Sequence, residues 1–177
     1  MNNRKQGFTL IELLITISVL AILLAIGAPN LQMFIQNSRL MSQTSGLVGD
    51  LNFARSEAVK RGGAVNVCAS ADGATCSGAV TWETGWIVFN ENSAPPNTAV
   101  DAGDAILRVT PALGGNNTLR AARPAIRFSP QGYSVGFVGF TDTFGACDSR
   151  GLGSARNVVV SNQGRVTTGT GGIASCP

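Results

Sequence analysis

A single carboxylate stands in a long apolar segment near the start of the chain. Glu12 is the only charged residue between positions 8 and 28, which otherwise hold mostly aliphatic side chains. A charged group in a spanning helix costs on the order of 2–3 kcal/mol for insertion, so it needs a partner of opposite charge. The segment itself offers no basic residue. We therefore expect Glu12 to bind the α-amino group of a neighbouring chain, which a cut between Gly7 and Phe8 would create on every copy.

Four cysteines are the other candidates for chemistry, and they allow three disulfide connectivities. A bond between Cys68 and Cys76 would close a short loop. A bond between Cys147 and Cys176 would fix the C-terminal tail and stabilise the fold by roughly 3 kcal/mol. The rival interpretation is a zinc site, but the sequence has no C-x-x-C spacing. The sequence therefore predicts two disulfides and no metal site.

The composition excludes several classes of enzyme. The chain has no histidine, which removes a Ser-His-Asp triad, histidine acid–base catalysis and histidine-ligated metals. The acidic residues are scattered, and no phosphate-binding, dinucleotide or calcium-loop motif is present. Lys+Arg 13 against Asp+Glu 10 gives +3, too small an excess to indicate nucleic-acid binding by charge alone. We expect neither catalysis nor a cofactor.

The apolar segment is long enough to cross a membrane, because positions 8–28 would form a helix of roughly 31 Å. Arg4 and Lys5 precede it, which keeps that end cytoplasmic and places the rest of the chain in the periplasm. That compartment is oxidising and favours disulfides. The alternatives are a signal peptide, a plain single-pass anchor and a buried core helix. A signal peptide is disfavoured because its apolar region is usually about 7–15 residues long.

The helix is expected to continue past Pro29 to position 62, where Gly62-Gly63 is a stop signal. Pro29 itself is expected to kink the helix near the membrane exit. Apolar residues after Pro29 recur at helical spacing and mark one face of an amphipathic helix. These residues are Leu31, Phe34, Ile35, Leu40, Leu47, Leu51, Ala54 and Ala58.

After position 63 the pattern changes to short apolar runs between turn residues, which is typical of an antiparallel sheet or sandwich. We expect Trp82 and Trp86 to pack in its core or at its edge rather than to bind a ligand. We also expect a hairpin turn at 162–164 and an exposed loop at 91–104. The chain is thus predicted to be α+β. The predicted strands cover residues 64–69, 85–90, 105–109, 125–129, 134–140, 156–161 and 164–168.

The start of the chain resembles a known processing signal. Gly7-Phe8-Thr9-Leu10-Ile11-Glu12, with a short basic leader before it, is similar to the class III signal of type IV prepilins and pseudopilins. The resemblance implies that a prepilin peptidase cuts after Gly7 and methylates the nitrogen of Phe8. It also implies that Glu12 sets the axial register of subunits in a filament. Loss of Arg4 and Lys5 removes two charges from the +3 of the full chain and leaves +1.

Segments of the second part resemble the GspH/FimT/FimU family of minor pilins and pseudopilins. They are LNFARSEAVKRG at 51–62, VNVCASADGATC at 65–76, WETGWIVF at 82–89, IRFSPQGY at 126–133 and NVVVSNQGRV at 157–166. The family implies the type IV pilin fold, a long N-terminal helix packed on a C-terminal antiparallel β domain. The expected divisions are a leader at 1–7, a transmembrane or filament-core helix at 8–28, its amphipathic continuation at 29–62 and a β-rich periplasmic domain at 63–177.

The resemblance implies a minor pilin that primes assembly of a type IV pilus or sits at its tip, with roles in twitching motility and adhesion. Its implied partners are other minor pilins and the major pilin, contacted through the N-terminal helix, together with the prepilin peptidase and the inner-membrane assembly platform. The implied location is the inner membrane, with the β domain in the periplasm, and later the pilus at the cell surface.

Two alternatives stay open from the sequence. The first is a FimT-like DNA receptor for natural transformation. Such family members carry a Gly-Arg-x-Arg element, of which Gly164-Arg165-Val166-Thr167 keeps only the first half. Arg150, Arg156 and Arg165 are the candidate phosphate contacts, and solvated surface arginines are the plain interpretation. The second alternative is a type II secretion pseudopilin of the GspH type, which would form a short periplasmic piston.

Overall fold

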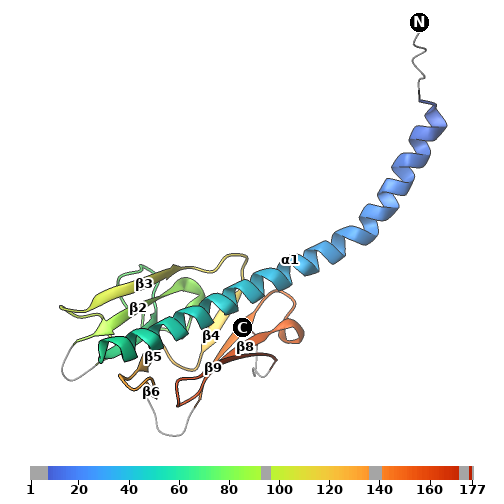
Figure 1. Ribbon diagram of the computed structural model, residues 1–177. Coiled ribbons are helices and arrows are strands. Elements are labelled where there is room, and N and C mark those ends of the chain that lie inside the picture. Colours follow the sequence, from blue (N-terminus) through green and yellow to red (C-terminus); the bar gives the residue numbers. More distant parts are fainter. Residues whose placement is uncertain (1–7, 93–96, 136–140, 172–175, 177) are drawn as a thin grey trace, which may run out of the picture. The chain divides into compact units, whose positions relative to one another are not determined.

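A computed structural model describes residues 8–92, 97–135, 141–171 and 176. The chain divides into two units, Met1–Ser38 and Arg39–Pro177. One helix, α1 (Leu10–Arg61), contributes to both of them (Figure 1). Pro29 lies inside α1 without ending it, and the kink expected there stays a prediction. The helix stops before Gly62, whose φ of 65° is a conformation that glycine adopts without strain.

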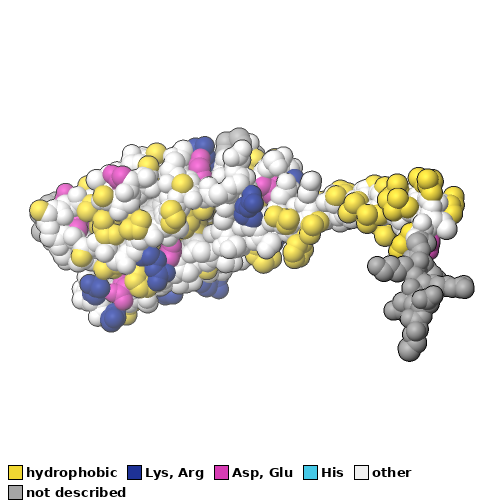
Figure 2. Space-filling model, turned by 90° about the horizontal axis from the view of Figure 1, so that it is seen from above, with side chains coloured by type: hydrophobic (Ala, Val, Ile, Leu, Met, Phe, Trp, Pro, Cys, Tyr) yellow, Lys and Arg dark blue, Asp and Glu magenta, His cyan; other side chains and the backbone are white. Residues whose placement is uncertain are grey.

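The first unit is described from residue 8 to residue 38, and its apolar side chains lie on the outside. The large ones, from Phe8 to Ile35, are between 46% and 85% exposed. Figure 2 shows them as a dense apolar surface along this part of α1. By length and composition α1 is able to cross a membrane. An apolar surface of this extent requires lipid or other protein around it.

In the second unit α1 lies against a five-stranded antiparallel sheet (Figure 1). The strand order is β3-β2-β1-β5-β6. The helix contributes the buried residues Leu40, Leu47, Leu51, Ala54 and Ala58, which lie on the face that the helical spacing marked. Leu31, Phe34 and Ile35 of the same face are exposed, because they lie in the first unit, outside the core. The strands are β1 (Ala64–Ala69), β2 (Gly85–Glu91), β3 (Ala105–Pro111), β5 (Ala125–Phe128) and β6 (Ser134–Val135).

A second antiparallel sheet has four strands in the order β4-β7-β8-β9. Its strands are β4 (Thr118–Ala121), β7 (Asp142–Cys147), β8 (Arg156–Val160) and β9 (Val166–Thr170). Two short 3₁₀ helices, η1 (Trp82–Thr84) and η2 (Leu152–Ser154), precede β2 and β8. The α+β architecture expected from the sequence, a long helix on antiparallel sheets, is therefore confirmed.

One hydrophobic core joins α1 to both sheets. Trp82 and Trp86 are both buried in it, as predicted. The ring of Trp82 meets Phe144 of β7 edge-on, with the ring centres 4.8 Å apart. The Trp82 indole N–H donates to the Arg123 carbonyl at 3.0 Å, so this polar atom is satisfied. The core lies entirely within the second unit, which therefore does not need the apolar half of α1 for its own packing.

A buried carboxylate on α1 fastens the helix to the five-stranded sheet. Asp50 is 6% exposed and accepts hydrogen bonds from the Trp86 indole at 2.8 Å and the Thr110 hydroxyl at 2.7 Å. Arg108 of β3 donates to its other oxygen at 2.7 Å and also lies over the ring of Phe53. Both oxygens of the carboxylate are satisfied, which makes its burial tolerable.

Some predicted strands differ from the observed ones. The sequence analysis missed β4 and β7, and it placed the last strand at 164–168, whereas β9 covers Val166–Thr170. The shift arises because Ser161 and Gly164 form the turn that precedes β9. The turn expected at 162–164 is therefore confirmed. Glu91 belongs to β2 rather than to the following loop, and positions 136–140 of the strand expected at 134–140 lie outside the described residues.

Replacing Asp50 with alanine should lower the free energy of unfolding by about 2–4 kcal/mol, because three donors lose their buried acceptor. Denaturant unfolding of the chain in detergent, followed by tryptophan fluorescence, measures this loss. Arg108→Gln is the matched control and should cost less, because the Arg108 side chain is 44% exposed. Equal losses in the two variants would contradict the role assigned to Asp50.

Candidate functional site

The described chain begins with a reciprocal pair of hydrogen bonds at the start of α1. The Glu12 backbone N–H donates to the Thr9 hydroxyl at 3.3 Å, and the Thr9 N–H donates to the Glu12 carboxylate at 3.5 Å. This arrangement is a capping box, which satisfies two of the free N–H groups at a helix start. A carboxylate in the first turn is also favoured by the helix dipole. The sequence analysis gave Glu12 only a partner in another chain and overlooked the T-x-x-E spacing.

Other polar groups in the apolar half of α1 satisfy themselves within the helix. Thr16 and Ser18 donate their hydroxyl protons to the carbonyls of Leu13 and Leu14, at 2.8 Å and 2.7 Å. The Asn30 amide donates to the Ile26 carbonyl at 3.0 Å. Bonds of this kind hide polar atoms from a lipid environment or a helix–helix contact. Glu12 is the only charged side chain among the described residues of this unit, and it remains able to bind a partner of opposite charge.

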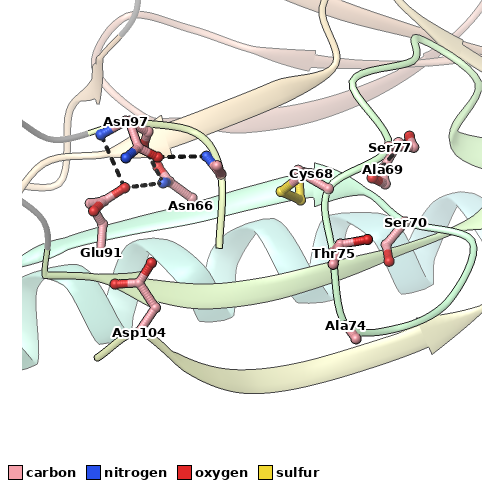
Figure 3. Close-up of a disulfide and its surroundings, with 12 residues drawn as sticks. Asn66, Cys68, Ala69, Ser70, Ala74, Thr75, Ser77, Glu91, Asn97 and Asp104 are labelled. Atoms are coloured by element: carbon pink, nitrogen blue, oxygen red, sulfur yellow. Dashed lines mark hydrogen bonds between the residues drawn. A yellow bond between two sulfur atoms is a disulfide. The ribbon is translucent and has the colours of Figure 1, made fainter. Parts of the chain in front are cut away.

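Both disulfides considered from the sequence are present in the structure. Cys68 of β1 is bonded to Cys76, and Cys147 at the end of β7 is bonded to Cys176. Figure 3 shows the first bond beside β1, with the loop that it closes. The carboxylate of Asp72 organises this loop by accepting hydrogen bonds from Ala74, Thr75 and Ser70. These bonds, the strongest from the Thr75 hydroxyl, hold the pKa of Asp72 far below its usual range.

A buried polar cluster fixes the chain that follows β2. Asn66 of β1 donates to the Glu91 carboxylate at 3.0 Å and to the Asn97 carbonyl at 2.8 Å (Figure 3). The Arg127 side chain of β5 donates to the Asn66 side-chain oxygen at 3.1 Å and to the Asn97 carbonyl. The donors and acceptors of this cluster bind one another, so the cluster has a structural role. The described residues contain no group of three or more acidic or cysteine side chains placed to hold a metal.

Two turns of the same type meet beside α1. Residues 129–132 (Ser-Pro-Gln-Gly) link β5 to β6, and residues 161–164 (Ser-Asn-Gln-Gly) link β8 to β9. In each turn the glycine N–H donates to the serine carbonyl at 2.8 Å. Each serine hydroxyl accepts from the N–H of the residue after the glycine. The expected absence of an internal repeat is therefore wrong at this scale, because the short S-x-Q-G pattern recurs in the two turns.

Arg55 of α1 binds both turns. Its Nε donates to the Gly132 carbonyl at 2.9 Å, and its Nη2 donates to the Gln163 carbonyl at 3.1 Å. The turns are in close contact, since a Cβ on Gly164 would lie 2.1 Å from the Gly132 oxygen. Arg55 therefore joins a hairpin of each sheet to the helix. A shallow groove of about 410 Å³ lies beside it, lined by Asn52, Arg55, Ser56, Val59 and Lys60.

The structure does not bring the three candidate DNA-contacting arginines together. Arg156 and Arg165 lie at opposite ends of the β8–β9 hairpin, since Arg156 pairs with Thr170 and Val160 pairs with Val166. Arg150 donates two hydrogen bonds from its Nε to the Asp148 carboxylate at 3.1 Å. These bonds lower the pKa of Asp148 and raise that of Arg150. A single phosphate-binding cluster of the three is therefore not formed.

The family of the type II transport protein GspH matches residues 43–164 of the chain. The chain belongs to the GspH family. A second match, the prokaryotic N-terminal methylation motif, covers residues 2–28. No match was found among curated proteins. The family assignment therefore rests on more than half of the chain, and the motif covers the apolar segment with Glu12.

Solved structures share the fold. One crystal form of the type IV minor pilin FimU from Pseudomonas aeruginosa is 21% identical, with a TM-score of 0.56 over 73% of this chain and 91% of FimU. A second crystal form of FimU is 23% identical, with a TM-score of 0.57 over 77% of this chain and 92% of FimU. This GspH-family protein thus has the type IV pilin fold. Family and fold are those of structural pilins rather than enzymes. The methylation motif and the apolar helix indicate membrane anchoring and incorporation with other pilins into a pilus or pseudopilus.

Replacing Arg55 with alanine should loosen both turns at once, because their carbonyls lose a shared donor at a cost of about 1–3 kcal/mol. Hydrogen exchange of the backbone amides at Gly132 and Gly164 measures the effect, and both should exchange faster. Ser56→Ala is the matched control, because Ser56 is exposed and bonds only to the Phe53 carbonyl. Faster exchange in one turn alone would show that Arg55 does not connect them.

Proposed function

We propose that this GspH-family protein is a minor pilin that starts a type IV pilus or sits at its tip. Cleavage between Gly7 and Phe8 by a prepilin peptidase, with methylation of the Phe8 nitrogen, would generate the mature chain. Residues 8–28 would anchor it in the inner membrane, with the domain at 63–177 in the periplasm. The observation that carries the proposal is that the first half of α1 begins with a self-capped carboxylate and exposes large apolar side chains, whereas the second unit packs its core without them.

Two environments would cover the exposed half of α1. Lipid covers an isolated apolar helix, and the same side chains can instead pack against the apolar helices of other pilins. The second unit has its own core, so moving the chain from membrane to filament would not require it to unfold. A subunit built in this way can wait in the membrane and later be extracted into a filament.

Glu12 would specify how the helices align. In the single chain its carboxylate is bound by the neutral N–H of Thr9 at 3.5 Å, which is a long hydrogen bond. A positively charged Phe8 amine of an adjacent subunit offers a charge-assisted bond, which is shorter and about twice as strong. In a core of low dielectric constant an unpaired carboxylate is costly, so subunits would settle where the pair forms. Other minor pilins, the major pilin and the inner-membrane assembly platform would be the partners of this segment.

The DNA-receptor alternative gains no support from the described residues, because its candidate arginines are separated. A type II secretion pseudopilin would use the same assembly step, and one comparison is named for type II transport and another for a type IV pilus. A deletion strain distinguishes these functions, because loss of twitching motility with normal secretion supports the pilus. The reverse phenotype would assign the chain to the secretion system.

Substitutions at the capping box separate the charge of Glu12 from its capping role. Glu12→Gln keeps a capping-box acceptor but loses the ionic partner, so the variant should insert into the membrane yet be recovered in sheared filaments at least about tenfold less. Glu12→Leu should behave in the same way. Thr9→Val is the matched control, because it removes the cap and retains the charge. Quantitative immunoblots of membranes and sheared filaments provide the measurement.

The three variants also give the outcome that would overturn the proposed role. Normal recovery of Glu12→Gln in filaments would show that the charge does not direct incorporation. Equal losses of filament recovery in Glu12→Gln and Thr9→Val would assign Glu12 a capping role alone. Mass spectrometry of the chain from cells tests the processing step, and an intact leader or cleavage near Gly27 would contradict it.

A further inference from the structure

The edges of the two sheets are not equally protected against pairing with another chain. In the described residues, β3 has a register shift opposite Val88 and Phe89 and ends at Pro111. β4 is bridged by Thr81 at Arg120, and β6 consists of two residues. Bulges, proline, coverage and short length are the devices by which proteins block edge pairing. Three of the four edge strands, namely β3, β4 and β6, therefore have at least one of these protective features.

In the part of the chain that the structure describes, β9 has none of these features. Its five residues keep an unbroken register with β8, from Val160 opposite Val166 to Arg156 opposite Thr170. The strand reads Val-Thr-Thr-Gly-Thr, with no charged residue and no proline, and its three threonines are exposed. No described strand pairs with its other side, so β9 is the outer strand of the four-stranded sheet. A regular, uncharged edge of this kind is a template for β-strand addition.

The bonds at either end of β9 show which backbone groups face outward. The backbone N–H of Ser161 donates to the Arg165 carbonyl at 2.9 Å, and the backbone N–H of Gly171 donates to the Ala155 carbonyl at 3.0 Å. Residues 165 and 171 thus direct backbone groups toward β8. Because these directions alternate along an antiparallel strand, Val166, Thr168 and Thr170 present their N–H and C=O groups to the free side.

Gly171 and Cys176, the last described residues, are both held away from this free side. Gly171 is bonded to Ala155, next to β8, and Cys176 is bonded to Cys147 of β7. In the strand order β7-β8-β9, both attachments lie on the opposite side of β9 from its free edge. The disulfide therefore holds Cys176 where it does not compete for the outward groups of Val166, Thr168 and Thr170.

We infer that β9 is a docking edge for β9 of a second copy of this chain. The strands pair antiparallel with Thr168 opposite Thr168, so that Val166 of each copy faces Thr170 of the other. This register uses every outward group and gives about six hydrogen bonds between the copies. It places β-branched side chains opposite one another and opposes no like charges, since Arg165 faces Gly171. The self-complementary, uncharged sequence favours a second copy over a charged partner strand.

The contact is small, and copies in dilute solution associate weakly through it. Chains confined to one membrane meet at a much higher effective concentration, which compensates for the small area. The inference draws on the membrane anchoring that the apolar half of α1 indicates, and it does not rest on the proposed pilus function. The pairing fits copies that are anchored in the same membrane.

Cysteine cross-linking of the full chain in its own membrane tests the register. Thr168→Cys brings the new thiols of two copies opposite each other, at a Cα separation of about 5.5 Å that a disulfide can bridge. Thr170→Cys is the matched control, because in the same register its two copies lie about 13 Å apart. After mild oxidation, a non-reducing gel should show at least about five times more dimer for Thr168→Cys.

A second substitution tests whether the dimer depends on strand pairing. Thr170→Pro in the Thr168→Cys background removes an outward N–H while leaving the bonds to β8, so the dimer should decrease at least about threefold. Maleimide labelling of both new thiols shows that each is accessible, and protease resistance of the β domain shows that each variant is folded. Equal dimer from both positions, no dimer from an accessible Thr168→Cys, or no effect of Thr170→Pro would overturn the inference. A cross-linked product of a different mass would assign the edge to another partner and also overturn it.

Discussion

The fold depends on one helix that must be buried in two different ways. In its second half α1 buries a single face, where Leu47, Leu51 and Ala58 meet the core. In its first half the apolar side chains surround the whole helix, and none of the large ones is less than 46% exposed. A single domain cannot cover such a surface, so this half requires lipid or a bundle of similar helices. Membrane residence and filament assembly are thus two solutions to the same burial requirement.

Polar side chains on α1 determine how the sheets are attached to it. Asp50 binds the five-stranded sheet through Trp86 and Arg108, and Arg55 binds one hairpin from each sheet. Hydrophobic packing alone is not directional and would tolerate sliding of the helix over the sheets. Hydrogen bonds with defined donors and acceptors fix one arrangement. The exposed surface of the domain is therefore held in one geometry, which contact with neighbouring subunits requires.

The features that local sequence determines were predictable, and those that distant residues determine were not. The periodicity of Leu47, Leu51 and Ala58 marked the apolar face that is buried in the core, because helical spacing is a local property. β4 and β7 were missed because their strand conformation comes from pairing with each other and with β8. The partners of Arg55 lie 77 and 108 positions away, so no local pattern could reveal them. The capping of Glu12 was predictable, since Thr9 and Glu12 are close in sequence.

The charged side chains of the domain are largely paired within the domain, and this limits how the domain can bind other molecules. Arg108, Arg120, Arg123 and Arg150 each form an ion pair with an acidic residue of the same unit. Arg55 is bound to carbonyls, which fixes its guanidinium beside the two turns. A surface organised in this way has little long-range attraction for a polyanion, and the formal net charge of +3 of the whole chain adds little. In the proposed assembly, recognition of neighbouring subunits would then come from short-range features, namely the carboxylate at the start of α1 and the backbone groups at the edges of the sheets.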